Sequence, residues 1–330
     1  MNPISRIVLR SLISAAAGLW SPPHDRRLNI IIFHRVRPTL DPLFPEEPDS
    51  LQFGRLMAVV AEHFNCLALD QAVEMLDKGM RLPARALAIT FDDGYADNCT
   101  EAMPILKKYR LTGTFFVASG YLNGGLMWND EVIELVRSYP DSSIDLRALD
   151  LSVLPCATLA ERRAVIDKLL ISIKYRQPLA RREALDALIE ITRGASPSNL
   201  MMTADQVREM RANGMTVGGH TLSHPILSSL DDQQAKREIG EDRENLAGIL
   251  GEQPQLFAYP NGKPGKDYHA GHPGMVRDAG YRAAVSTAWG SAHHGDDLLQ
   301  LPRFTPWDQN AARFALRLAH NYSRSTFLHA

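Results

Sequence analysis

Two short motifs supply carboxylates and imidazoles of the kind that a catalytic metal site requires. The first is Asp92-Asp93-Gly94, which directly follows an apolar run at residues 86–91. Because side chains alternate along a strand, one aspartate can bind a metal ion while its neighbour handles protons. An ordinary Asp-Asp-Gly turn is the alternative, since these residue types favour turns.

The second motif is His-Thr-Leu-Ser-His at residues 220–224. Two histidines four positions apart can share one face of a helix, as in zinc metalloproteases. Here Pro225 follows His224 directly and two glycines precede His220, and both features disfavour a helix. We therefore expect the pair at a strand end and in the loop after it, with two structural histidines as the alternative.

Together the motifs offer one carboxylate and two imidazoles, a set that suits catalytic zinc with one open position for water. Metal-bound water loses a proton near pH ~7, and the spare aspartate is then placed to accept it. The same ligand set suits non-haem iron oxygenases, and the ligands alone do not decide between the two. A third motif, Tyr259-Pro260-Asn261 after an apolar run, can aim backbone N–H groups at an oxyanion.

The elements that must position these residues alternate along the chain, which predicts a parallel α/β sheet or barrel. Short apolar runs predict strands at 28–33, 86–91, 113–117, 216–219, 255–259 and 283–286. Apolar residues at helical spacing predict helices at 50–62, 97–109 and 231–250, with Asp231 and Gly251 at the ends of the last. Thr203 and Gln206 form a predicted capping box.

Residues 126–200 break this alternation, with helical spacing at 159–173 and 182–191, and are interpreted as a helical insertion. The predicted organisation is an N-terminal amphipathic segment at 1–25, barrel parts at 26–125 and 201–310, and a C-terminal helix or tail at 311–330. The apolar stretch at 11–20 is too short to span a bilayer and has no convincing cleavage site. Peripheral membrane contact is therefore one hypothesis for it, and a cytoplasmic or membrane-peripheral location is favoured over secretion.

The overall composition excludes several classes of protein. The 330 residues carry a formal net charge of -2, so no strong basic field points to nucleic acid. The three cysteines, Cys66, Cys99 and Cys156, are far apart, which predicts buried thiols and no disulfide framework.

With Thr-Phe-Asp-Asp-Gly at 90–94 and His-Thr-Leu-Ser-His at 220–224, the chain resembles polysaccharide deacetylases, the NodB-homology group of carbohydrate esterase family 4. The resemblance implies a distorted (β/α)7 TIM-like barrel that removes acetyl groups from N-acetylated glycans, in exopolysaccharide or cell-envelope metabolism. It assigns Asp92 as catalytic base and Asp93, His220 and His224 as ligands of a divalent metal, usually Zn2+ and sometimes Co2+ or Ni2+. It also places the backbone N–H of Asn261 at the oxyanion.

The chain departs from the family pattern at two positions. Ala258 stands where many members carry an arginine that orients the base, and Arg303 is our candidate partner for Asp92, with a plain ion pair as the alternative. No Leu-x-His motif supplies the general acid near the C-terminus. His34, at the end of the first predicted strand, is the preferred replacement, with a structural role as its alternative, and His293 and His294 are looser candidates.

Substrate contacts are predicted for Tyr95, Tyr259, Pro260 and Trp128, and the segment at 128–131 resembles one found in bacterial subfamilies linked to exopolysaccharides. Two other functions remain open. Related barrels hydrolyse other non-peptide C–N bonds, and loss of the usual arginine and acid is compatible with an inactive carbohydrate-binding barrel. Retention of all four residues Asp92, Asp93, His220 and His224 counts against the inactive barrel.

Overall fold

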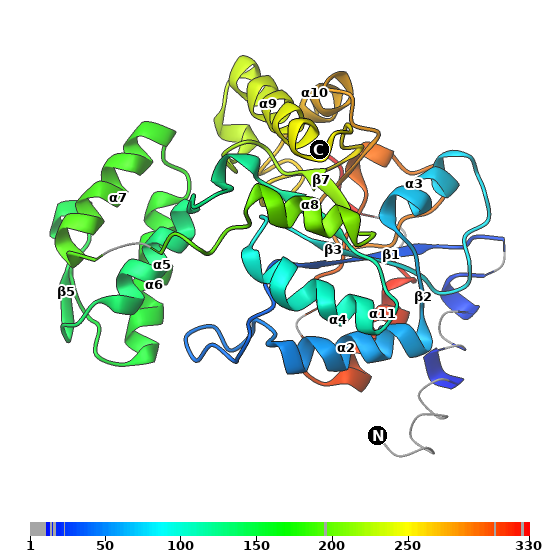
Figure 1. The fold of residues 1–330 in the computed structure, drawn as a ribbon, viewed down its shortest axis with the longest axis horizontal. Helices are drawn as coiled ribbons and strands as arrows, with labels where there is room; N and C mark the ends of the chain where they lie inside the picture. Colours follow the sequence, from blue (N-terminus) through cyan, green and yellow to red (C-terminus); the bar gives the residue numbers. More distant parts are fainter. Residues whose placement is uncertain are drawn as a thin grey trace.

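Apolar residues on both faces of the strands produce a parallel sheet that is covered by helices on its outer side. The computed structural model describes residues 11–13, 15, 18–22, 24–194, 197–306, 308–324 and 327–330. A curled sheet with surrounding helices forms the larger body, and a smaller helical body lies beside it (Figure 1). This arrangement confirms the predicted distorted barrel with a helical insertion.

The sheet has the order β1-β3-β4-β7-β8-β9, with β2 also paired to β3, and all of these pairs are parallel. Its strands are β1 (Leu28–Phe33), β2 (Asn65–Cys66), β3 (Ala86–Phe91), β4 (Thr114–Val117), β7 (Thr216–Gly219), β8 (Leu256–Ala258) and β9 (Ala283–Val285). Three predicted strands are one or two residues shorter than expected, and the other three match. Every residue of β1 and β3 is buried, as expected for strands inside a barrel.

Residues 301–304 close the barrel between its first and last strands. Leu301 forms a parallel bridge with Val285 of β9, and Phe304 forms one with Ile31 of β1. Backbone hydrogen bonds fix both contacts, including one of 2.8 Å from the Phe304 N–H to the Ile30 carbonyl. This closing segment therefore fills the gap between β9 and β1 and places Arg303 inside the ring.

Helices surround the barrel, and the predicted caps form. Asp231 caps α9, Gly251 ends it with a left-handed φ of 74°, and Thr203 with Gln206 makes the capping box of α8. The predicted helix at 97–109 begins instead as a π-helical turn, η1 (Asn98–Ala102). The other helices of the barrel are α2 (Ser50–His63), α3 (Leu69–Asp77), α4 (Met103–Lys108), α8 (Ala204–Ala212), α9 (Asp232–Leu250), α10 (His272–Asp278) and α11 (Ala311–Asn321), with short 3-10 turns η2 (Ser119–Tyr121), η4 (Leu227–Ser229) and η5 (Leu298–Gln300).

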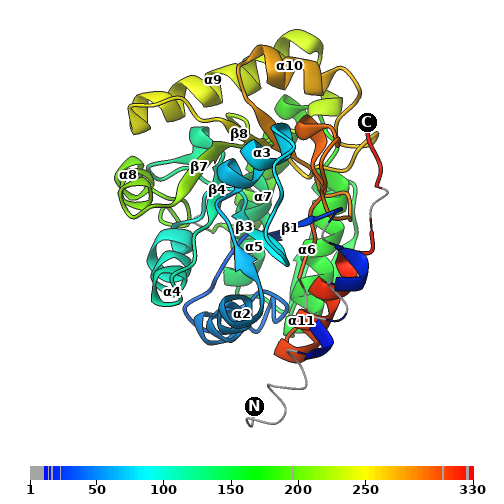
Figure 2. The ribbon, with the colours of Figure 1, turned by 90° about the vertical axis from the view of Figure 1, so that its right-hand side faces the viewer.

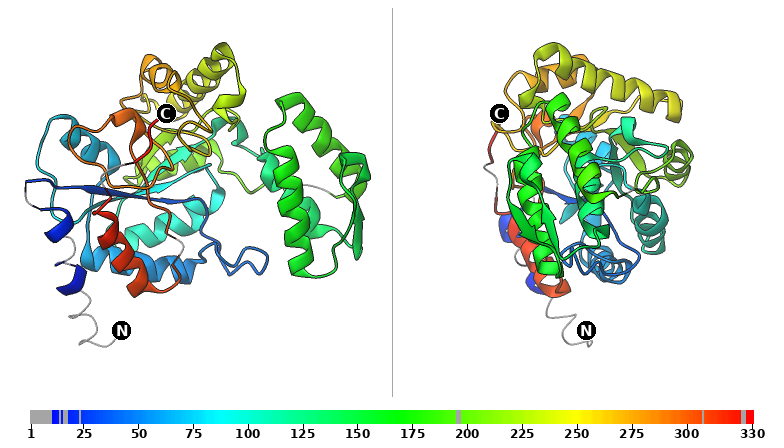
Figure 3. Two further views of the ribbon diagram at one scale, coloured as in Figure 1. Left: turned by 180° about the vertical axis from the view of Figure 1, so that it is seen from behind. Right: turned by 90° about the vertical axis from the view of Figure 1, so that its left-hand side faces the viewer.

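The insertion has a separate hydrophobic core, whose buried members lie at residues 132–188 except for Leu43 from the barrel part of the chain. It contains α5 (Trp128–Ser138), β5 (Ser143–Asp145), η3 (Arg147–Leu149), β6 (Val153–Pro155), α6 (Leu159–Ile173) and α7 (Pro178–Thr192). The antiparallel β5–β6 hairpin was not predicted, and α7 begins earlier than expected because Pro178 occupies its first turn. Seen from behind, the insertion again lies beside the barrel as a separate group of helices (Figure 3).

The N-terminal segment packs beside α11 (Figure 2). Residues 1–10, 14, 16, 17 and 23 of the predicted 1–25 segment lie outside the described residues. Of the rest, Ile13 is buried in the main core, and the ring of Trp20 lies 5.1 Å from that of His320. Among the described residues, no helix has the length and apolar character to cross a membrane. Peripheral membrane contact stays a prediction.

All three cysteines are free thiols, as expected, but Cys66 is only half-buried, because it lies on the short edge strand β2.

Candidate active site

The candidate residues meet at one end of the barrel because parallel strands bring their carboxyl ends together. Phe33 of β1 is in register with Phe91 of β3, so His34 and Asp92 follow at the same level. Val117 of β4 is in register with Gly219 of β7, and His220 comes next along the chain. The first and second motifs, 127 residues apart in sequence, therefore share one rim.

Asp93, His220 and His224 form the one group of three potential metal ligands found among the described residues. One carboxylate oxygen of Asp93, Oδ1, lies 3.3 Å from Nε2 of His220 and 3.3 Å from Nε2 of His224. The potential ligand atoms all lie within 4.8 Å of one another. One oxygen and two imidazole nitrogens are a donor set that zinc accepts, so the residues fit a divalent metal.

His220 is oriented by groups on both sides of it. Its Nδ1 lies 2.7 Å from the carbonyl of Ala258, which leaves Nε2 facing Asp93. A carbonyl partner on Nδ1 is the usual way in which a protein fixes the tautomer of a metal-binding histidine. The residue that replaces the family's arginine thus contributes through its backbone.

The backbone before His220 is held by Asp242 of α9. Its carboxylate accepts from the N–H of His220 at 2.9 Å and from the N–H of Ser119 at 3.0 Å, which joins the ends of β7 and β4. Gly219 allows this approach, because a Cβ there would lie 2.0 Å from the Tyr281 hydroxyl and 2.7 Å from Asp242. Asp242 was missed in the sequence, although an aspartate among the buried residues Ala235, Ile239 and Leu246 of one helix was the available signal.

Asp92 is held by Arg303 in a bidentate ion pair. Nη1 and Nη2 of the guanidinium each lie 2.7 Å from a different carboxylate oxygen, and Nε donates to the Ser286 carbonyl at 2.8 Å. The Arg303 side chain is 0% exposed. Arg303 belongs to the segment that closes the barrel, so this segment also fixes the orientation of the Asp92 carboxylate.

The charges of the site follow from burial and from these pairs. Burial alone raises the pKa of Asp92, but the Arg303 guanidinium and His220 outweigh it, and the pKa lies below its usual value. The pKa of Asp93 is also lowered: its hydrogen bond to His220 and the nearby imidazoles outweigh the effect of burial. Burial lowers the pKa of His224 to about 4, so its imidazole is neutral, as a metal ligand must be.

An open cavity of about 340 Å³ brings these residues together with His34, Asn261 and Trp128. His34 is exposed there, and the next residue, Arg35, is anchored by Asp97, with 2.8 Å from its Nε to the carboxylate. The remaining lining residues are Met127, Asn129, Leu170, Ile171, Lys174 and Thr287. Leu170, Ile171 and Lys174 come from the insertion, which thus forms one wall of the cavity. The sequence did not single them out.

Three of the residues that line the cavity adopt left-handed backbone conformations, which are unusual for residues other than glycine. The φ angles are 79° for Asp93, 51° for His224 and 57° for Asn261. Such conformations persist only where the surrounding structure enforces them, and they concentrate at functional sites. Asn261 is held by its carbonyl, which accepts from the Thr287 hydroxyl at 2.9 Å.

Other predicted residues lie outside the cavity lining. Tyr95 is buried and its hydroxyl donates to Asp130 at 3.2 Å, while the Tyr259 hydroxyl donates to the Leu299 carbonyl at 2.9 Å. Pro260 is also buried. Of the three, Tyr95 packs in a small buried cluster with Met127, which lines the cavity. Direct substrate contact by Tyr95, Tyr259 and Pro260 stays a prediction. His293 and His294 lie elsewhere, with Nδ1 of His294 2.9 Å from the Leu76 carbonyl.

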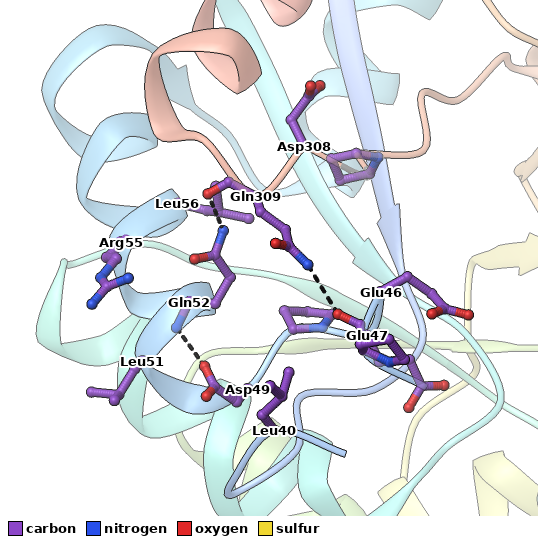
Figure 4. Close-up of a pocket in the computed structure, with 13 residues that line it drawn as sticks. Leu40, Glu46, Glu47, Asp49, Leu51, Gln52, Arg55, Leu56, Asp308 and Gln309 are labelled. Carbon is purple, nitrogen blue, oxygen red and sulfur yellow. Dashed lines mark hydrogen bonds between the residues drawn. The ribbon is translucent and has the colours of Figure 1, made fainter. Parts of the chain in front are cut away.

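A larger hollow of about 410 Å³ contains none of the site residues. It lies between the loop before α2, the start of α2, and the residues Pro306, Asp308 and Gln309 (Figure 4). Its amides bond to the protein itself: Gln52 donates to the Gln309 carbonyl at 2.6 Å, and Gln309 donates to the Pro45 carbonyl at 3.0 Å. Size alone therefore does not identify the functional cavity.

The part of this chain that is similar to known proteins includes Asp92 and the three potential metal ligands of the candidate site. A family model described as polysaccharide deacetylase matches residues 79–145 and 185–284, which include both motifs. YxkH of Bacillus subtilis (strain 168), a curated protein that carries the polysaccharide deacetylase name, is 22% identical over 240 residues, or 73% of this chain. The chain spans 58% of the length of that relative.

Two solved structures share the fold. The deacetylase PplD of Streptococcus pyogenes, in complex with acetate, has a TM-score of 0.57 and 18% identity, and the match covers 85% of this chain and 92% of PplD. IcaB from Ammonifex degensii has a TM-score of 0.57 and 18% identity, covering 88% of this chain and 97% of IcaB.

Proposed function

This chain belongs to the polysaccharide deacetylase family, and we propose that it is a metal-dependent hydrolase that releases acetate from N-acetyl groups of a glycan. One observation carries the proposal: Asp93 converges with two histidines while its neighbour Asp92 is held apart by Arg303. Neighbouring carboxylates in different surroundings can perform different tasks.

Asp93, His220 and His224 would hold the metal, and zinc is our first choice, with cobalt or nickel as alternatives. When bound, the metal supplies Lewis acidity, which lowers the pKa of a coordinated water and polarises the acetamide carbonyl. Because the pKa values of Asp93 and His224 are both lowered, the carboxylate is ionised and the His224 imidazole is neutral at neutral pH. Neither group has to lose a proton before it can bind a metal ion.

Asp92 is proposed as the general base. A base must be ionised and aimed at the attacking water, and the two hydrogen bonds from Arg303 provide both conditions. Arg303 thus takes over the orienting task of the arginine that Ala258 replaces.

Asn261 and His34 complete the proposed mechanism. The backbone N–H of Asn261 would donate to the oxyanion of the tetrahedral intermediate. His34, on the same rim as Asp92, would donate a proton to the departing amine. Free amine and acetate are then the products.

Acetate release tests the proposal. The purified protein is stripped of metal with a chelator, reconstituted with Zn2+, Co2+ or Ni2+, and incubated with N-acetylglucosamine oligomers. We expect acetate release only after reconstitution, and a large loss in the Asp92→Asn variant with metal content unchanged. Glycan binding without acetate release by any metal form would instead favour the inactive carbohydrate-binding barrel.

A further inference from the structure

The catalytic cavity shares a wall with a second hollow of about 190 Å³, and the residue common to both is Trp128. The second hollow lies between the barrel and the insertion. The barrel contributes Tyr121, Ser223 and Pro225, and the insertion contributes Trp128, Arg181 and Leu185, among others. A ligand that leaves the catalytic cavity past Trp128 enters this hollow next.

The barrel wall of the second hollow is part of the metal-binding loop itself. Ser223 and Pro225 flank His224 on either side, and the Tyr121 hydroxyl donates to the Ser223 carbonyl at 2.8 Å. The two hollows are therefore adjacent along this loop as well as across Trp128, which is the arrangement expected for neighbouring sugar positions on one polymer.

Arg181 is the most unusual residue of the second hollow. It is 9% exposed, yet none of its hydrogen bonds within the described chain goes to a carboxylate: Nη2 donates to the Lys174 carbonyl at 3.0 Å and the Arg176 carbonyl at 3.4 Å. Its Nε is buried without a partner, and its guanidinium lies 5.0 Å above the ring of Trp128. A buried guanidinium without a counter-charge is costly, and an anionic ligand would reduce that cost.

Lys174, in the catalytic cavity, is a second cation without a counter-charge. Within the described ranges its ammonium has no carboxylate partner, and Nζ lies 5.8 Å from the centroid of the Tyr175 ring. Asp92 and Asp93, which also line the cavity, are already committed to Arg303 and the histidines. By contrast, the charge of Arg182 is balanced by Glu131 at 3.0 Å.

We infer that the two hollows form one groove for an acidic N-acetylated glycan, with the reacting sugar at the metal ligands and an anionic group of the glycan at Arg181 and Lys174. The inference rests on the proposed function and names its substrate class. A uronate carboxylate and a phosphodiester share the required chemistry, because arginine and lysine bind both kinds of anion.

Three oligomers of matched length separate these possibilities: a neutral N-acetylglucosamine oligomer, a heparosan oligomer in which N-acetylglucosamine alternates with glucuronate, and an N-acetylglucosamine 1-phosphate oligomer. We expect kcat/KM for acetate release to be at least about tenfold higher on one or both acidic oligomers, with the preference shrinking at high salt because ionic attraction is screened. Which acidic oligomer is preferred identifies the anion.

Lys174→Gln and Arg181→Gln test the assignment to these residues. The matched control is Lys168→Gln, which removes an exposed charge from α6, the helix that ends next to Lys174, outside both hollows. We expect each test variant to lower kcat/KM on the preferred acidic oligomer about fivefold more than on the neutral one, mainly through KM. Arg181 also bonds two backbone carbonyls, so Lys174→Gln keeps the test valid if Arg181→Gln folds poorly.

Equal efficiency on neutral and acidic oligomers would overturn the inference and leave the proposed function intact. Absence of acetate from all three would count against the proposed function. In that case calorimetric binding of the same oligomers to the unmodified protein still tests the groove, and tighter binding of the neutral oligomer would overturn it.

Discussion

The two walls of the proposed catalytic cavity are built in different ways. On the barrel side, the functional groups are held by several bonds each: Asp92 by both nitrogens of Arg303, and His220 by Ala258 and Asp242. On the insertion side, Ile171 is 77% exposed and Lys174 has few partners among the described residues. Under the proposed function, the rigid barrel wall would carry out the chemistry, which needs fixed geometry, and the insertion wall would select the glycan.

The comparison predicts that changes on the barrel wall reduce the rate of the chemical step, whereas changes on the insertion wall alter substrate affinity. Substitutions on each side, and one at the boundary between the two bodies, test this difference.

The largest effect is expected from Asp93→Ala. Loss of one of three ligands should remove the bound metal and lower kcat/KM by more than ~10³-fold, because water activation and oxyanion stabilisation fail together. Elemental analysis and acetate release measure the two effects on the same sample. Asp278→Ala, an exposed change on α10, is the control, and retention of both metal and rate in Asp93→Ala would refute the ligand assignment.

Arg303→Gln should lower kcat/KM by about 10²-fold, because Asp92 loses its orientation. The guanidinium lowers the pKa of Asp92, so its removal raises that pKa and moves the acid limb of the pH–rate profile to higher pH. Arg303→Lys keeps the charge without the bidentate fork and should shift the limb less. An unchanged acid limb in Arg303→Gln would show that Asp92 is not the titrating base.

At the boundary between barrel and insertion, Asp130→Asn should change the dependence of stability on pH. Burial raises the pKa of Asp130 to about 7, so the folded protein favours the protonated carboxyl. The contribution of the protonated Asp130 carboxyl to the unfolding free energy is fully present below the unfolded pKa of about 4. It is lost as the pH rises from there through about 7. Asparagine does not titrate, so the variant should gain roughly 2–3 kcal/mol relative to the wild type between about pH 5 and about pH 8.

Denaturant unfolding of the wild type and of Asp130→Asn at about pH 5 and about pH 8 measures this change in the unfolding free energy. Asp141→Asn, a substitution at an exposed position, is the control. A constant difference between Asp130→Asn and the wild type at both pH values would contradict the raised pKa.

The smallest effect is expected from Ile171→Ala on the insertion wall. Removing an exposed apolar side chain from the cavity should raise KM by roughly two- to fivefold and leave kcat and the unfolding free energy almost unchanged. Leu179→Ala, an equally exposed change on α7 outside the cavity, is the comparison. A fall in kcat with KM constant would mean that the insertion takes part in the chemical step.

The sequence predicted the barrel well because its signals are local. Continuous apolar runs mark buried parallel strands, and residues such as Asp231 and Gly251 mark helix ends by their own hydrogen bonds and backbone preferences. The two motifs follow strand ends, so their meeting at one rim follows from parallel topology.

The insertion wall was not predicted because it depends on how two bodies pack together. Nothing local to Lys174 or Ile171 indicates that the end of α6 faces His220, and the β5–β6 hairpin is only three residues per strand. Asp242 was missed for a related reason: its partners are backbone N–H groups of Ser119 and His220, which sequence patterns do not reveal.

The closing segment at residues 301–304 is synthesised after all the strands that it joins, and it also carries the partner of Asp92. Until it leaves the ribosome, the nascent chain has unpaired edges on β1 and β9, and Asp92 lacks its counter-ion. Closure of the sheet between β1 and β9 and formation of the Asp92–Arg303 ion pair are thus one event, because both depend on the same short segment. A chain that ends before residue 301 would therefore combine unpaired strand edges, which favour aggregation, with an Asp92 carboxylate that lacks its partner.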